Sequence, residues 1–183
     1  MRAPLPTPLA WIDTFTERLG KALTWLVLIM MLTEFLIVVL RYLFNVSNTP
    51  MQESVMYMHA TVFLLAAAYT LKHDGHVRVD IFYRGMSMKK KAWVDLLGTL
   101  FLLLPVMIFV VIASLGYVDK SWRILEGSPE SGGLPGVFLL KTLIPVFAVL
   151  MSLQGLVEIT RNILIIRGHT LSEDDHDHPE EYV

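Results

Sequence analysis

Residues 96–116 read LLGTLFLLLPVMIFVVIASLG, a run without a single charged side chain. About twenty consecutive apolar residues in a helix span the hydrocarbon core of a bilayer. Trp93 precedes the run, and Tyr117 and Trp122 follow it, as expected for the aromatic residues that gather at the two headgroup layers. The run therefore predicts a transmembrane helix at about residues 93–117, and with it an integral membrane protein.

Three further apolar stretches, two before this run and one after it, are also long enough to cross the bilayer. Together they predict four transmembrane helices, at about residues 20–42, 51–71, 93–117 and 137–160. The composition agrees, because 54% of the 183 residues are hydrophobic and only 17% are charged, which is too apolar for a soluble domain. No polar linker divides the chain, so residues 1–183 are expected to form one all-α membrane domain.

Lysine and arginine are distributed unevenly between the two sides of the four predicted spans. The side with both chain ends and the middle loop carries Arg2, Arg18, Lys21, Lys72, Arg78, Arg84, Lys89, Lys90, Lys91, Arg161 and Arg167. The other side carries only Arg41, Lys120, Arg123 and Lys141. Because cytoplasmic flanks are enriched in these residues, both termini are predicted to be cytoplasmic. The acidic tail, residues 171–183, is expected to be disordered.

Two segments carry helix-start signals. Thr49 and Pro50 supply a hydroxyl cap and a proline for the first helical position, and Glu53 follows near the positive end of the helix dipole. Thr7 and Pro8 are expected to begin a short amphipathic helix. That helix is predicted to lie in the membrane interface, ahead of the first span.

The composition also excludes several classes of function. Without cysteine the chain has no disulfide and no thiolate metal site, and a formal charge of −2 argues against a nucleic-acid partner. His73, Asp74, His76 and Asp80 lie in one predicted loop and could suggest a metal site, but Gly75 makes this segment read more simply as a helix stop. No catalytic motif, metal site or cofactor is therefore predicted.

Glu34 is the single charge within the first predicted span, where a carboxylate costs roughly 2.5–3.5 kcal/mol and needs a partner. Counting the rise per residue places Glu34 at the same depth as His59 of the second span. We therefore hypothesise a hydrogen bond between Glu34 and His59 that joins the two helices. The alternative is that Glu34 stays protonated or bonds to another subunit.

The fourth predicted span carries several polar residues. Lys141 lies close to its outer end, so the ammonium is expected to reach the interface, with a substrate ligand as the alternative. Gln154 could bond across helices, and Glu158 and Arg161 are spaced to pair on one helical face. Between the third and fourth spans, residues 127–136 hold four glycines and two prolines, which favours a shaped turn.

Several of these segments together resemble the small permease of tripartite ATP-independent periplasmic (TRAP) transporters, a family of the DctQ type. The matching segments are Gln52-Glu53, His73-Asp-Gly-His-Val-Arg-Val-Asp80, Gly127-Ser-Pro-Glu-Ser-Gly-Gly-Leu-Pro135, Lys141-Thr-Leu-Ile-Pro145 and Leu153-Gln-Gly155. Within or beside the matching segments, the candidates for structural or interaction roles are Glu53, His76, Arg78, Asp80, Gly132, Gly133, Pro135, Lys141 and Gln154. Many relatives are expected to have an uncharged polar residue at the position of Glu34, so no role is carried over to it.

The resemblance implies a non-enzymatic subunit of the bacterial inner membrane. Its partners would be a large multi-span permease that holds the sodium and substrate sites, a periplasmic solute-binding protein, and membrane lipids. Such a system takes up an organic acid or a related solute, driven by the sodium gradient. The sequence has neither a nucleotide-binding loop nor paired broken helices, which agrees with a supporting role.

Two other classes of function are compatible with a four-helix membrane protein. A self-contained, proton-coupled small-molecule exporter would use Glu34, but such exporters have short loops and little charge bias between the two sides. A membrane haem protein would need histidines at matching depth on facing helices, and His59 is the only histidine within a predicted span. The exporter is therefore the main alternative.

Overall fold

The computed structural model describes residues 6–76 and 83–168, and within them every regular element is a helix. The elements are α1 (Thr7–Phe44), α2 (Thr49–Leu65), α3 (Ala67–Lys72), α5 (Met88–Gly98), the π-helix η1 (Thr99–Leu103), α6 (Leu104–Arg123) and α7 (Val137–Ile166). Four continuous helical stretches are long and apolar enough to cross a membrane: Thr7–Phe44, Thr49–Lys72, Met88–Arg123 and Val137–Ile166. The all-helical class with four spans is therefore confirmed.

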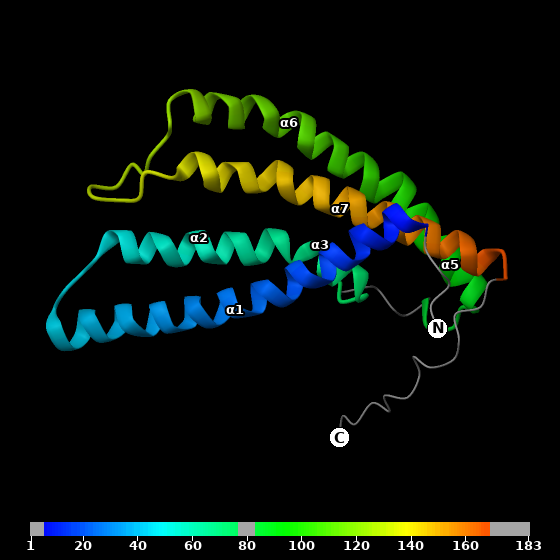
Figure 1. Cartoon of the computed structure of the whole chain (residues 1–183), viewed down its shortest axis with the longest axis horizontal. Helices are drawn as coiled ribbons and strands as arrows, with labels where there is room; N and C mark the ends of the chain where they lie inside the picture. The colour runs from blue at the N-terminus through cyan, green and yellow to red at the C-terminus, as the bar shows by residue number, and fades with distance from the viewer. Residues whose placement is uncertain (1–5, 77–82, 169–183) are drawn as a thin grey trace, which may run out of the picture.

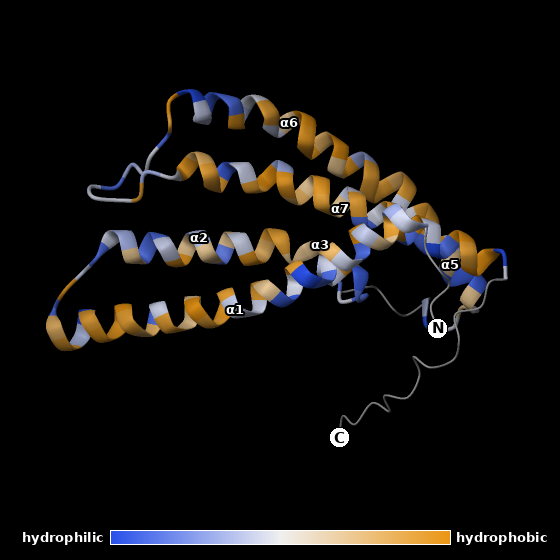
Figure 2. Cartoon of the chain, in the orientation of Figure 1, coloured by the Kyte–Doolittle hydropathy of each residue, from blue (hydrophilic) through white to orange (hydrophobic). Residues whose placement is uncertain are grey.

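The spans lie side by side, in the order α1, α2, α7 and α6, in a sheet-like layer that Figure 1 shows down its shortest axis. α1 packs on α2, α2 on α7, and α7 on α6. A layer of this kind leaves much of each helix uncovered, and only 6–17% of the residues in the apolar windows of the four spans are buried. Figure 2 shows the hydrophobic residues spread along all four spans. These uncovered apolar faces suit lipid or a second membrane protein.

The short interfacial helix predicted at the amino terminus begins at Thr7 as expected, but it is not a separate element. α1 runs without interruption for 38 residues, which corresponds to about 57 Å. The prediction of a separate short helix is wrong, because no proline follows Pro8 within α1 and Asp13 of this segment bonds to α3 and α7. These contacts hold the amphipathic segment in line with the span.

The start of α2 also differs by one residue from the prediction. Asn48, not Thr49, is the N-cap, and its side-chain Oδ1 accepts a hydrogen bond from the backbone N–H of Met51 at 3.0 Å. The amide oxygen of asparagine caps a helix as well as a hydroxyl does, so the cap moves back by one position. Pro50 still lies in the first turn, where its missing N–H has no cost.

The third span contains a π-helical segment, η1, directly ahead of Pro105. The backbone N–H of Leu104 bonds to the carbonyl of Thr99, five residues earlier. Pro105 can offer no N–H of its own, and a π-turn widens the helix at such an interruption. Leu103 of η1 packs closely on Gly155 of α7, where an added Cβ would lie 2.9 Å from the Leu103 Cδ2. The segment therefore brings α6 and α7 together at a glycine.

Gly20 is the closest glycine contact between α1 and α3. A Cβ added at Gly20 would lie 2.2 Å from Cδ2 and 2.4 Å from Cγ of the Tyr69 ring. The Cγ atom is next to the Tyr69 backbone, so the ring cannot swing away without a change of rotamer. Only glycine fits here without displacing α3.

We expect Gly20→Ala to lower the free energy of unfolding by about 1–3 kcal/mol, because it overpacks this contact. Gly116→Ala is the matched control, since a Cβ at Gly116 meets nothing within 4 Å. In a helix that control should be neutral or slightly stabilising. Unfolding of both variants in mixed micelles with increasing denaturing detergent measures the difference, and equal midpoints would contradict the close packing.

Candidate functional site

A cluster of ion pairs joins α1, α3 and α7 at the end of the layer where α1 begins and α7 ends. At its centre the Lys72 ammonium lies 3.1 Å from Asp13 Oδ2 and 3.0 Å from Glu17 Oε2. The same Nζ donates a hydrogen bond to the backbone carbonyl of Asp13 at 3.0 Å. The Lys72 side chain is only 5% exposed, so these three acceptors replace the water it has lost.

Arg161 extends the cluster to α7. Its guanidinium lies 2.6 Å from Asp13 Oδ1 and 2.7 Å from Glu158 Oε1, which confirms the predicted pair of Glu158 and Arg161. The buried Gln154 donates a hydrogen bond to Glu158 at 3.1 Å, along its own helix rather than across to another. The reason is the spacing of four residues, which places the two side chains on one face of α7.

The histidines of the loop after α3, for which a metal site was only the alternative to a helix stop, do not form a metal site in the described part of the chain. His73 Nε2 lies 2.9 Å from Glu17 Oε2, and its ring packs on Tyr69 with centroids 4.4 Å apart. No group of three or more potential metal ligands is gathered within the described residues. His76 is exposed, and Arg78 and Asp80 lie outside the described residues. His73 therefore belongs to the ion-pair cluster.

Glu53 holds the loop between α6 and α7 at the opposite end of the layer. Its Oε1 accepts a hydrogen bond from the Ser128 hydroxyl, and its Oε2 accepts one from the backbone N–H of Leu134 at 2.6 Å. Gly133 lies directly against this contact, because an added Cβ would be 2.7 Å from Glu53 Oε1. Gly132 has a φ of +76°, which glycine adopts without strain. We call Glu53, Ser128, Gly132, Gly133 and Leu134 the loop latch; Pro135 follows its last member.

Lys141 is partnered within the chain rather than extended freely to the interface. Its Nζ lies 2.5 Å from Glu126 Oε2 and 4.0 Å from the centroid of the Tyr117 ring. The Ser121 hydroxyl donates to the same Glu126 oxygen at 2.6 Å. Hydrogen bonds from Lys141 and then Ser121 lower the pKa of the Glu126 carboxyl below its ordinary value. The ion pair ties the start of α7 to the end of α6.

The lowered pKa of Glu126 predicts how the contribution of this residue to the free energy of unfolding changes with pH. A carboxyl whose pKa is depressed in the folded protein adds stability above its unfolded pKa, and this is lost as the pH falls through the folded value. We expect Glu126→Gln to be less stable than wild type by the same amount at pH 7 and pH 6, and the difference to shrink progressively as the pH falls below about 4. Thermal unfolding across this range measures it; a difference that grows on acidification would have the wrong sign.

Glu34 and His59 do not form the predicted pair. Each lies ten residues from the connection between α1 and α2, so their depths match, but both side chains are exposed. His59 stacks on Phe63 with ring centroids 6.3 Å apart, and Glu34 has no hydrogen-bond or ion-pair partner within residues 6–76 and 83–168. Equal depth does not fix the direction in which a side chain points around its helix.

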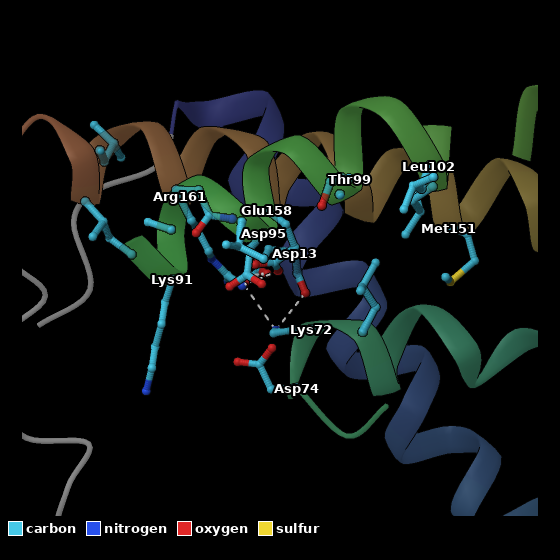
Figure 3. Close-up of a pocket in the computed structure, with 18 of the residues that line it drawn as sticks. Asp13, Lys72, Asp74, Lys91, Asp95, Thr99, Leu102, Met151, Glu158 and Arg161 are labelled. Atoms are coloured by element: carbon cyan, nitrogen blue, oxygen red, sulfur yellow. Dashed lines mark hydrogen bonds and ion pairs between the residues drawn. The ribbon is translucent and has the colours of Figure 1, made fainter. Parts of the chain in front are cut away.

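A groove of about 1180 Å³ is lined by residues of α1, α3, α5 with η1, the start of α6, and α7. Figure 3 shows its charged end, where Asp13, Lys72 and Arg161 meet, and its apolar end near Leu102 and Met151. This groove could not be predicted from the sequence, because its walls come from segments far apart in the chain. The ion-pair cluster was not predicted either. The acids of α1 were interpreted as the polar side of an interfacial helix, and Lys72 was interpreted as a charge that flanks a span.

The four spans and these clusters define a multi-pass membrane protein whose polar groups join helices and loops, with no arrangement of nucleophile and base among the described residues. The sequence model of one protein family, the DctQ component of tripartite ATP-independent periplasmic transporters, matches residues 30–164. The chain belongs to this family, and it is a transporter component rather than an enzyme. No curated protein and no solved structure matches it.

Proposed function

We propose that the chain is the small subunit that supports the large permease of a TRAP transporter. In this role it enlarges the static part of the membrane complex, against which the transport domain moves. The complex takes up an organic acid or related solute, which a periplasmic binding protein delivers and the sodium gradient drives. The observation that carries the proposal is the thin layer of spans, with its uncovered apolar faces, in a chain of the DctQ family.

Polar contacts at both ends of the layer support a static role. The ion-pair cluster joins α1, α3 and α7 at one end, while the loop latch and the Lys141–Glu126 pair join α2, α6 and α7 at the other. Elements tied at both ends resist sliding past one another. A scaffold needs this rigidity, because the transport domain moves against it.

The orientation in the membrane is part of the proposal. The excess of lysine and arginine on the side of the chain ends and the middle loop favours cytoplasmic termini in the bacterial inner membrane. The ion-pair cluster would then lie on the cytoplasmic side. The loop latch would lie on the periplasmic side, within reach of a solute-binding protein.

Glu34 is proposed to contact the large subunit. It lies about 15 Å from the end of α1 at Phe44, deep in the apolar span, with its side chain exposed. A carboxyl in contact with lipid costs roughly 2.5–3.5 kcal/mol, which a hydrogen-bond donor from a partner helix would offset. Glu34 therefore marks the face of α1 that is covered in the complex.

Purification of the tagged chain from its native membrane tests the proposal. Wild type should recover a multi-span protein of the TRAP large-permease family, identified by mass spectrometry. Glu34→Leu should lower the recovery about fivefold, which corresponds to about 1 kcal/mol for one hydrogen bond between membrane helices. Glu34→Gln, which keeps an acceptor, and Phe35→Leu, at an exposed neighbouring position, should leave it unchanged. Wild type that recovers no such permease would refute the proposal.

A further inference from the structure

The exposed residues of α2 form a single stripe along the helix. Within Thr49–Leu65 the exposed residues follow one another at spacings of four, three and four, which places them on one face. They are Gln52, Met56, His59 and Phe63. α1 and α7 both pack on α2, so this stripe is the part of α2 that the chain itself leaves uncovered.

His59 gives the stripe a polar group deep in the membrane. It lies ten residues after Thr49 and thirteen before Lys72, so it is about 15 Å and about 20 Å from the two ends of this helical stretch. The imidazole is too short to reach a headgroup layer from there. A neutral imidazole has one donor and one acceptor, and neither has a hydrogen-bond partner within residues 6–76 and 83–168.

The exposed faces of α7 and α6 have a different chemistry. Within Val137–Ile166 the exposed residues are Leu139, Val146, Val149 and Leu156, which are all apolar. In α6, every exposed residue from Leu104 to Gly116 is apolar as well. Lipid tails solvate such faces, whereas an ionisable group at this depth faces protein or a water-filled cavity.

The exposed ionisable groups at mid-depth therefore lie on one half of the layer. The spans follow one another in the order α1, α2, α7 and α6 (Figure 1). Glu34 of α1 and His59 of α2 are each about 15 Å from the connection between these two helices. Both lie in the α1–α2 half, so it is this half that needs hydrogen bonds from a partner.

We infer that the large permease covers the stripe of α2 and bonds to His59, while the α6–α7 half of the layer faces lipid. The inference rests on the proposed function and adds the face on which the partner lies. The contact is a membrane helix with a hydrogen-bonding side chain at mid-depth, which offsets the cost of an imidazole in hydrocarbon. Met56 and Phe63, 51% and 72% exposed, supply the apolar contact on either side.

The absence of cysteine allows the stripe to be probed with single spin labels. Met56→Cys places a nitroxide on the stripe, and Val146→Cys and Ile112→Cys place one on α7 and on α6. These positions are seven, nine and eleven residues from the helix ends at the same side of the layer, about 10–16 Å deep (Figure 1). Power saturation in liposomes measures how often each label collides with dissolved oxygen, for the chain alone and for its complex with the large permease.

Oxygen accessibility at Met56→Cys should fall about threefold in the complex, because the core of an interface is packed like a protein interior. Val146→Cys and Ile112→Cys should keep the accessibility that they have in the chain alone. A complex in which the Met56 label stays accessible would overturn the inference while leaving the proposed function intact. Absence of any complex with the unlabelled chain would overturn both.

Substitutions at His59 test the hydrogen bond without a label, and they decide alone if the Met56 label prevents assembly. His59→Leu should lower recovery of the large permease about fivefold, the effect expected of one hydrogen bond between membrane helices. His59→Gln, which has both a donor and an acceptor, should retain it, and Val146→Leu on α7 should not change it. Equal recovery by wild type and a folded His59→Leu would overturn the inference.

A second copy of the chain is the competing occupant of the stripe. The family is one component of tripartite transporters, which favours a different chain. If a second copy covered the stripe, Met56→Cys would be poorly accessible to oxygen before the large permease was added, and its labels would broaden each other's spectra. That result would overturn the inference.

Discussion

Replacing Lys72 with methionine is expected to destabilise the protein by about 3 kcal/mol. The Lys72 side chain is 5% exposed and bonds to carboxylates of Asp13 and Glu17, which are 18% and 26% exposed. Methionine fills a similar volume but leaves two partly buried carboxylates facing each other without their shared cation. Breaking a buried pair costs about 3–5 kcal/mol, and the partial exposure of the acids places the loss at the low end.

Lys21→Met is the matched control for this prediction. Lys21 also pairs with Glu17, at 3.2 Å, but its side chain is 72% exposed. Exposed pairs contribute about 0–1 kcal/mol, so the control should be nearly as stable as wild type. Detergent unfolding followed by circular dichroism compares the two variants. Equal losses for Lys72→Met and Lys21→Met would mean that the cluster does not hold α1 onto α3.

Substituting Glu53 with glutamine should loosen the loop between α6 and α7. The carboxylate accepts bonds from the Ser128 hydroxyl and the Leu134 N–H, and a glutamine side chain can accept with only one of its two terminal atoms. A hydrogen bond to a charged group is worth about 1.5–3 kcal/mol. Loss of about 2 kcal/mol should speed hydrogen exchange at the Leu134 amide about thirtyfold.

Glu130→Gln controls for the loss of a loop charge, because Glu130 is exposed in the same loop. Its effect on exchange at Leu134 should be small. Hydrogen exchange read by mass spectrometry over residues 127–136 distinguishes the two variants. If Glu53→Gln leaves this segment as protected as wild type, the loop is held by its own turns rather than by the latch.

The four spans could be predicted from the sequence because each depends on a local property. A run such as residues 96–116 is apolar and long enough to predict a transmembrane helix by itself. The start of α2 was predicted to within one residue, since caps are also local. The continuity of α1 could not be predicted, because it depends on contacts of Asp13 and Glu17 with residues far along the chain.

The polar contacts were harder to predict for a physical reason. Lipid is as apolar as the faces between helices, so hydrophobicity does not reveal how a membrane helix is rotated. Glu34 and His59 lie at the same depth in the membrane but do not bond to each other, while Glu53 bonds to a loop more than seventy residues away. The glycines of that loop did predict a shaped turn, and Gly132 and Gly133 are both part of it.

The most direct test is to measure solute uptake by purified protein in liposomes, with and without the large subunit. If the chain is a support, liposomes that contain it alone should show no uptake under any ion gradient. Liposomes with both subunits and the binding protein should show uptake that depends on sodium. Flux through the chain alone, abolished by Glu34→Gln, would contradict the supporting role and identify a self-contained exporter.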